Sequence, residues 1–310
     1  MPDEGILSSR PKSILLPRFD TIGDIVLLEG FLEVLLQCFP EAKLTLLVRR
    51  VYSDLAPLFP ENIDWLTTNI DPLTQAPDVS LCKELLADLA GGTWDLVLTT
   101  AHSRTWAEDL LAASKVGSEG FAIGHWTKPA PIAERVFAQL DLPIDCPYAQ
   151  VIPVSEKSHE VEKYRILLRT LVGESTLPEP RLRVNEHQRL AAQTTLQSMG
   201  LDIKKFCLCF PAGTQKISIK TWPPDRFGEI IAWLEAERGV KTLVAGHRSE
   251  NGCVEEVVRI AGAKGARPGK WLGRDGEIPV LAALSSAAKF YLGNDTGPMH
   301  IAAAVNTPVV

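Results

Sequence analysis

A short acidic segment near the N-terminus has the residue types of a catalytic turn. The apolar run 13–19 leads into Arg18-Phe-Asp-Thr-Ile-Gly-Asp24, and a helical pattern begins at Asp24. A carboxylate in such a turn can act as a general base and take a proton from a substrate hydroxyl. Asp is also common as a helix N-cap, where it adds about 1 kcal/mol of stability. Gly23 would give the turn its conformational freedom. The turn alone leaves both interpretations of Asp24 open.

A second segment carries groups that suit a phosphate. Pro211-Ala-Gly-Thr214 follows an apolar strand pattern, and Lys216 and Lys220 precede the helix opener Trp222-Pro-Pro224. Backbone N–H groups near a glycine, the Thr214 hydroxyl and a lysine ammonium such as that of Lys220 could together bind a phosphate group. A solvated, lysine-bearing loop has the same composition, so that alternative stays open. The glycine patterns of P-loop and dinucleotide sites are not found in the sequence.

A third segment, Gly293-Asn-Asp-Thr-Gly-Pro-Met-His300, ends an apolar strand and opens a helix. Free N–H groups at a helix start favour an anion. Thr296 and His300 are four residues apart and therefore share one face of that helix. A structural histidine is the common alternative for His300, but three polar side chains meet at this loop, so we favour ligand contact here.

The loop Gly246-His-Arg-Ser-Glu250 is a weaker signal of the same kind, in which Glu250 would either bond a ribose or cap the next helix. His247 in this loop lacks partners at metal-ligand spacing, as do His102 and His125, so no metal ion is predicted. The six cysteines form no CxxC pair and are expected to be free thiols in a reducing compartment.

Strand and helix patterns alternate along the chain and place these segments at strand ends. Strands are predicted at 13–19, 43–48, 94–99, 206–210, 241–245, 289–293 and 307–310. Helices are predicted at 24–38, 51–58, 81–90, 104–113, 225–237, 251–261, 278–287 and 297–304, and the polar segment 151–172 is mainly helical. Such alternation gives parallel sheets, which bind ligands at the carboxyl ends of their strands. The sequence therefore predicts an α/β protein with two Rossmann-like, doubly wound domains facing a cleft, residues 1–175 and 181–310.

The composition excludes several classes of protein. The 310 residues are 45% hydrophobic and 23% charged, which excludes disordered, collagen-like and disulfide-scaffold chains. Residues 1–150 contain 11 Lys and Arg against 21 Asp and Glu, and the rest contain 21 against 17, so the second half suits an anionic ligand better. Aromatic residues do not interleave with basic runs, so no nucleic-acid partner is expected. With no visible signal peptide or apolar run of about 20 residues, the protein is predicted to be cytoplasmic, and peripheral membrane contact stays open.

Together these segments resemble glycosyltransferase family 9, the family of the ADP-heptose:lipopolysaccharide heptosyltransferases. The resemblance rests on Leu15-Leu-Pro-Arg-Phe-Asp-Thr-Ile-Gly-Asp-Ile-Val26, on Pro211-Ala-Gly with Lys220-Thr-Trp-Pro223, and on Asn294-Asp-Thr-Gly-Pro-Met-His-Ile-Ala-Ala-Ala304. It implies a GT-B fold and an inverting, metal-independent transfer. The family's pattern continues past the last strand, so we also expect a second domain truncated at Val310, with weakened stability.

The resemblance also implies roles for the singled-out residues. Asp24 would be the base at the acceptor hydroxyl, with Arg18, Gly23 and Arg104 on the acceptor side. Lys220 and the region of Thr214 would neutralise the departing diphosphate. The remaining donor contacts would come from Glu250, Asp295, Thr296, Gly297 and His300.

The predicted function is transfer of a sugar, taken to be a heptose, from a nucleotide-diphosphate donor such as ADP-heptose. The acceptor would be a hydroxyl of a lipopolysaccharide-core-type or other glycan at the inner face of the cytoplasmic membrane. No separate cofactor is expected. One alternative is a non-catalytic nucleotide-sugar-binding or assembly protein, and another, a nicotinamide-dependent oxidoreductase, is disfavoured by the missing glycine pattern. An anionic acceptor would require basic residues in the acidic half, with Arg18, Arg49, Arg50 and Arg104 as candidates.

Overall fold

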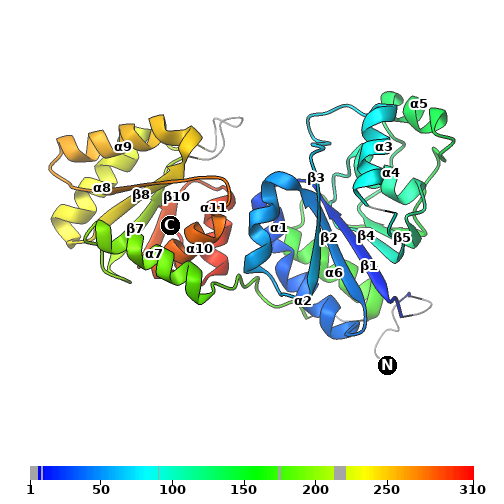
Figure 1. The fold of residues 1–310 in the computed structure, drawn as a ribbon, viewed down its shortest axis with the longest axis horizontal. Coiled ribbons are helices and arrows are strands. Elements are labelled where there is room, and N and C mark those ends of the chain that lie inside the picture. The colour runs from blue at the N-terminus through cyan, green and yellow to red at the C-terminus, as the bar shows by residue number, and fades with distance from the viewer. Residues whose placement is uncertain (1–5, 8–9, 90, 174–175, 213–220) are drawn as a thin grey trace. The chain divides into compact units, whose positions relative to one another are not determined.

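The computed structural model describes residues 6–7, 10–89, 91–173, 176–212 and 221–310. The chain forms two compact units. Unit 1 consists of Met1–Ala56 with Pro60–Glu179, and unit 2 consists of Pro57–Phe59 with Pro180–Val310. Each unit has its own parallel sheet (Figure 1).

Unit 1 is built on a six-stranded parallel sheet. In spatial order its strands are β3 (Ile63–Thr68), β2 (Lys43–Arg49), β1 (Ser13–Arg18), β4 (Trp94–Thr99), β5 (Gly117–Ile123) and β6 (Gln150–Ile152). The chain winds outward from β1 to β3 and then returns to the other side of β1 at β4. In such sheets a ligand crevice opens between the two central strands, at their carboxyl ends. The loops after β1 and β4 border this point.

Two groups of helices cover the unit 1 sheet (Figure 1). The helices α1 (Ile22–Leu27), α2 (Glu29–Cys38) and α6 (Glu160–Val172) contact one another. On the other face, α3 (Val79–Asp88), α4 (Trp106–Ala113) and α5 (Pro131–Gln139) contribute to one buried cluster with β1 and β4. The 3-10 helix η1 (Arg50–Leu58) follows β2.

Unit 2 repeats this winding with fewer strands. Its parallel sheet has the order β10 (Phe290–Gly293), β7 (Phe206–Phe210), β8 (Lys241–His247), β9 (Gly269–Gly273). The helices α8 (Pro224–Arg238) and α9 (Asn251–Ala263) pack together over one buried cluster, while α10 (Ile278–Ala287) contacts α7 (Glu186–Ser198) and α11 (Gly297–Ala304). The reversal lies between β7 and β10, so the loops after these two strands border the second ligand edge.

The predicted fold class is confirmed, and several element predictions need correction. The strands β4 and β7 and the helices α10 and α11 have the predicted bounds. Among the described elements, β3, β5, β6, β9, α5 and α7 were not predicted. Strand β5 begins Gly-Ser-Glu-Gly, a poor strand sequence, and pairing with β4 and β6 holds it in place. The predicted strand at 307–310 is an isolated bridge between Val309 and Tyr291.

The helix predicted at 24–38 is two helices. It begins at Ile22, with Thr21 as N-cap, and it is interrupted at Leu28 between α1 and α2. Asp24 is therefore not the N-cap but the third helical residue. Among the described helices, none combines the length and the apolar character that crossing a bilayer requires.

Candidate active site

Asp24 is held in a defined orientation at the carboxyl end of β1. Its Oδ2 accepts hydrogen bonds from the Thr21 backbone N–H at 3.2 Å and from the Thr21 hydroxyl at 2.7 Å, as in a capping box. Its Oδ1 lies 3.5 Å from Nη2 of Arg18. The side chain is still 27% exposed. Both oxygens are thus oriented by neighbours, and the carboxylate stays accessible to a substrate.

Gly23 does not play the part expected from the sequence. It lies buried within the first turn of α1, and its φ is outside the left-handed region. A helical backbone needs no glycine, so conformational freedom does not explain this residue. It packs beside Asp24 in a buried position.

Arg18 is a buried cation in a ring of polar partners. Its side chain is 1% exposed, and its Nε lies 2.6 Å from Oδ1 of Asp20. Its Nη1 donates a hydrogen bond of 3.3 Å to the hydroxyl of Thr100, which follows β4. Its Nη2 lies 3.5 Å from Oε2 of Glu160 on α6. Burial opposes the charge, but the surrounding negative groups raise the pKa of Arg18 overall.

Arg104 lies on the β4 side of the unit 1 crevice and is also internal. Its guanidinium donates hydrogen bonds of 2.9 Å to the backbone carbonyls of Ile123 and His125. Its Nε lies 3.3 Å from Oδ1 of Asp109, which in turn accepts a hydrogen bond from the Tyr148 hydroxyl. With 5% of its side chain exposed, Arg104 fixes the loop after β5.

The remaining basic candidates on the acceptor side differ in exposure. Arg49 is partly buried and pairs with Asp71 at 2.9 Å. Arg50 is exposed, and its Nε donates a 2.8 Å hydrogen bond to Oδ1 of Asn69. Of the four arginines named from the sequence, Arg50 therefore presents its side chain most openly.

In unit 2, four of the seven predicted donor residues lie in the loop after β10 and the start of α11. Thr296 is the N-cap of α11, and Gly297 is its first residue. Nε2 of His300 lies 3.9 Å from Oδ1 of Asp295, whose side chain is 58% exposed. The start of α11, with its positive dipole end, therefore lies beside an imidazole and a carboxylate at the carboxyl edge of the sheet.

Asn294 has a structural role that was not predicted from the sequence. Its side chain is buried; its Nδ2 donates a 2.7 Å hydrogen bond to the carbonyl of Pro211, and its Oδ1 accepts one of 3.0 Å from the N–H of Trp222. One amide thus links the loop after β10 to both flanks of the segment between Pro211 and Trp222. Thr214 and Lys220, predicted to bind the diphosphate, lie outside the described residues.

Glu250 lies after β8, on the far side of β7 from the Asp295 loop. Its Oε2 accepts a 2.9 Å hydrogen bond from the His247 N–H, which caps the turn leading into α9. This is the capping role that the sequence left open beside ribose binding. Nε2 of His247 lies 3.2 Å from Oδ1 of Asp275.

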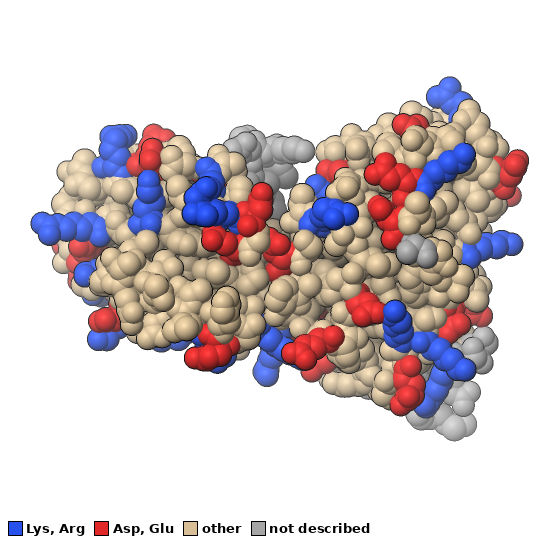
Figure 2. All heavy atoms as spheres, in the orientation of Figure 1, with Lys and Arg blue, Asp and Glu red and all other residues tan. Residues whose placement is uncertain are grey.

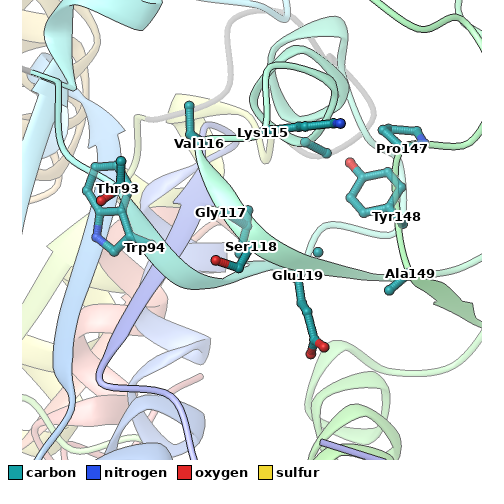
Figure 3. Close-up of a pocket in the computed structure, with 13 residues that line it drawn as sticks. Thr93, Trp94, Lys115, Val116, Gly117, Ser118, Glu119, Pro147, Tyr148 and Ala149 are labelled. Carbon is teal, nitrogen blue, oxygen red and sulfur yellow. The ribbon is translucent and has the colours of Figure 1, made fainter. Parts of the chain in front are cut away.

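A pocket of about 530 Å³ lies elsewhere in unit 1 (Figure 3). Trp94 and Tyr148 stand on opposite sides of it, and Lys115, Gly117 and Glu119 contribute to its lining. These residues lie at or before the starts of β4, β5 and β6, the sheet edge opposite Asp24. None of the residues predicted from the sequence lines this pocket. Among the described residues, no three His, Cys, Asp or Glu side chains are grouped to hold a metal ion.

Charges on the face drawn in Figure 2 are mixed. Lys and Arg alternate with Asp and Glu over both units. The more basic composition of the second half thus forms no continuous basic patch on this face, and recognition of an anion would depend on individual groups such as the α11 start.

Comparison with known proteins agrees with this geometry. The family described as glycosyltransferase family 9 (heptosyltransferase) matches residues 146–310. The chain is 24% identical over 292 residues to lipopolysaccharide heptosyltransferase 3 of Escherichia coli K12, covering 93% of this chain and 78% of that protein.

Solved structures extend the likeness to the fold of both units. The glycosyl transferase family 9 structure from Veillonella parvula DSM 2008 gives a TM-score of 0.75 at 21% identity, covering 99% of this chain and 82% of that one. The E. coli heptosyltransferase WaaC with ADP-2-deoxy-2-fluoro heptose gives 0.66 at 18% identity, covering 96% and 87%. Since the family match spans more than half of its residues, the chain belongs to glycosyltransferase family 9 and is a glycosyltransferase.

Proposed function

We propose that this glycosyltransferase moves a heptose from a nucleotide-diphosphate donor to a hydroxyl of a lipopolysaccharide-core-type glycan, with inversion and without a metal ion. The observation that carries the proposal is the Asp24 carboxylate, oriented by Thr21 and Arg18 and still exposed at the ligand edge of unit 1. The relative named lipopolysaccharide heptosyltransferase 3 supports the choice of sugar and acceptor.

The chemistry assigns one step to each unit. Asp24 takes the proton of the acceptor hydroxyl while the oxygen of that hydroxyl attacks the anomeric carbon of the donor sugar. The bond from that carbon to the diphosphate oxygen breaks, and the diphosphate leaves with the electron pair. Attack from the opposite face inverts the anomeric configuration. The developing negative charge requires donors in unit 2, and the start of α11, His300 and Lys220 are the groups that we assign to it.

Exchange of one carboxylate tests the base. Asp24→Asn removes the proton acceptor and keeps the shape, so we expect transfer from ADP-heptose to a deacylated core oligosaccharide to fall by about 10²–10⁴-fold. Thermal stabilisation by ADP should persist, since the donor site lies in unit 2. Asp64→Asn is the matched control, because Asp64 is exposed near the start of β3, at the opposite sheet edge, and should keep full activity.

The outcomes separate two classes of protein. Unchanged transfer by Asp24→Asn rules out Asp24 as the base. A wild-type protein stabilised by nucleotide sugars that transfers to no glycan hydroxyl would instead be a non-catalytic binding protein.

Metal removal is an independent test. With the leaving charge assigned to protein groups, EDTA should leave the transfer rate within about twofold of the untreated enzyme, because no Lewis acid is used. A rate that collapses in EDTA and returns with Mg²⁺ would contradict this part of the proposal.

We also propose that the protein acts in the cytoplasm, at the inner membrane face where its acceptor would be anchored. No disulfide joins the six cysteines, all of which lie in the described part of the chain, and thiols persist in a reducing compartment. Co-sedimentation with inner-membrane vesicles that contain the acceptor, and loss of binding without it, would support this placement.

A further inference from the structure

We propose that Arg18 and Glu160 form a positioning pair that sets how strongly Asp24 is held and how readily it accepts a proton. The proposal rests on the proposed function, in which Asp24 is the base. Glu160 lies far from Asp24 in the sequence and outside the three segments on which the family resemblance rests.

One nitrogen atom is shared between two carboxylates. Nη2 of Arg18 lies 3.5 Å from Oδ1 of Asp24 and 3.5 Å from Oε2 of Glu160. Both distances are longer than an aligned charged hydrogen bond, which is near 2.8 Å. Nη2 therefore forms an aligned hydrogen bond with neither carboxylate, and removal of the Glu160 charge would let it move closer to Asp24.

The other contacts of Arg18 fix the guanidinium in place. Nε is close to Asp20, Nη1 bonds Thr100, and the ring of Tyr164 lies 5.8 Å from the guanidinium carbon. A planar guanidinium held at three points directs its remaining nitrogen along one line. A lysine ammonium at this position could not make these contacts together.

Glu160 has one oxygen engaged and one available to Arg18. Its Oε1 pairs with Nζ of Lys163 at 2.6 Å on the next turn of α6. Its Oε2 is buried and forms no aligned hydrogen bond among the described residues. A buried carboxylate oxygen in that state draws strongly on the nearest cation, here Arg18.

The charged and titratable groups around Asp24 come from several elements. Arg18 belongs to β1, Asp20 to the turn before α1, and Glu160 and Tyr164 to α6, while Tyr52 on η1 is within electrostatic range. Glu160 acts on Asp24 in two ways, as a like charge and as a competitor for Nη2. Both effects disfavour the ionised Asp24, so removal of the Glu160 charge should make Asp24 a weaker base.

The test follows the titration of Asp24 itself. Protein labelled with ¹³C at the Asp carboxyl carbons is titrated by NMR, with Asp24→Asn used to identify the signal. Glu160→Gln should move the midpoint of the Asp24 signal down by about 0.5 pH unit, and Arg18→Lys should move it up by a similar amount. Glu162→Gln is the matched control, since Glu162 lies on the same helix, is 46% exposed and pairs with Arg165.

Transfer kinetics give a second readout. Glu160→Gln should lower kcat about twofold at a pH above the acid limb, because only part of the loss in base strength reaches the rate, and should leave the KM for ADP-heptose unchanged. The acid limb of the profile should move to lower pH. A merely structural role would lower activity evenly across pH and would not move the limb.

The outcomes separate this inference from the proposed function. A folded Glu160→Gln protein with the same Asp24 midpoint as wild type and Glu162→Gln overturns the pair. If Glu160→Gln does not fold, an unmoved midpoint in Arg18→Lys overturns it. Midpoints that move while Asp24→Asn still transfers the sugar support the electrostatic pair and overturn Asp24 as the base.

Discussion

The charged side chains buried in unit 1 mainly contact one another and nearby polar groups. Arg18 and Arg104 were predicted on the acceptor side, and both guanidinium groups are bound to internal partners on either side of the β1–β4 crevice. Two of the partners of Arg18 were not predictable, because Thr100 and Glu160 meet it only through the fold, whereas Asp109 is close to Arg104 in the sequence.

A buried carboxyl in α4 makes stability depend on pH. Glu108 accepts hydrogen bonds from the N–H and the hydroxyl of Thr105, and burial raises the pKa of Glu108 from 4.5 to about 7. Below pH 4.5 both the folded and unfolded states hold the proton. Between 4.5 and about 7 the unfolded state releases it first, so folding stability falls as pH rises.

Glu108→Gln should remove this pH dependence and keep the capping box, since glutamine also serves at that position. The free energy of unfolding of the variant minus that of wild type should be about 1–3 kcal/mol larger at pH 7.5 than at pH 5. Urea denaturation at both pH values measures the gain. An equal difference at the two pH values would show that Glu108 ionises normally.

At the scale of elements, the candidate site residues lie after strand ends, and neighbouring strands and caps determine where the elements begin and end. The runs that became β1, β4, β7 and α11 were clear in the sequence because apolar periodicity dominates them. Strand β9, Gly-Lys-Trp-Leu-Gly, was missed because two glycines and a lysine hide a strand that pairing with β8 creates. Asp24 was singled out by its residue type and its place after β1, but its position as the third helical residue depends on the Thr21 cap, which was not predicted.

The Asn294 amide should matter for stability and for donor binding together. It both donates and accepts, so Asn294→Ala leaves the Pro211 carbonyl and the Trp222 N–H without this partner and should cost about 1–3 kcal/mol. The KM for ADP-heptose should rise several-fold, with a smaller change in kcat. Asn62→Ala, at an exposed turn of unit 1, is the control. A donor KM unchanged in folded Asn294→Ala would separate this amide from donor binding.

At the scale of the whole molecule, each of the two sheets, which share the same winding, carries one part of the proposed site. The proposed base lies at the reversal point of unit 1, and the proposed donor contacts lie at that of unit 2. Sequence periodicity was sufficient for this architecture because both units follow the same rule of strand, helix and parallel strand. The identity of the sugar depends on individual contacts, which the rule does not determine.

Hydrogen exchange should reveal this division. On adding ADP, backbone amides at the start of α11 should be protected several-fold, since in the proposed donor site the diphosphate would order that turn. Amides of the turn before α1 should be unaffected. AMP, with one phosphate fewer, should protect α11 less. Equal protection in both units, or protection before α1 only, would contradict the assignment of the donor to unit 2.

The contact between Leu58 and Arg183 affects how this enzyme could be recombined. The carbonyl of Leu58 accepts a 2.8 Å hydrogen bond from the Arg183 N–H, and Pro57–Phe59 belongs to unit 2 although the rest of η1 belongs to unit 1. A chimera that replaces everything from Pro180 onward with the half of another family member would therefore keep three residues fitted to the discarded partner. Replacing those three residues together with the second half should restore expression and melting temperature. The chimera should then have the donor preference of the protein that supplied its second half.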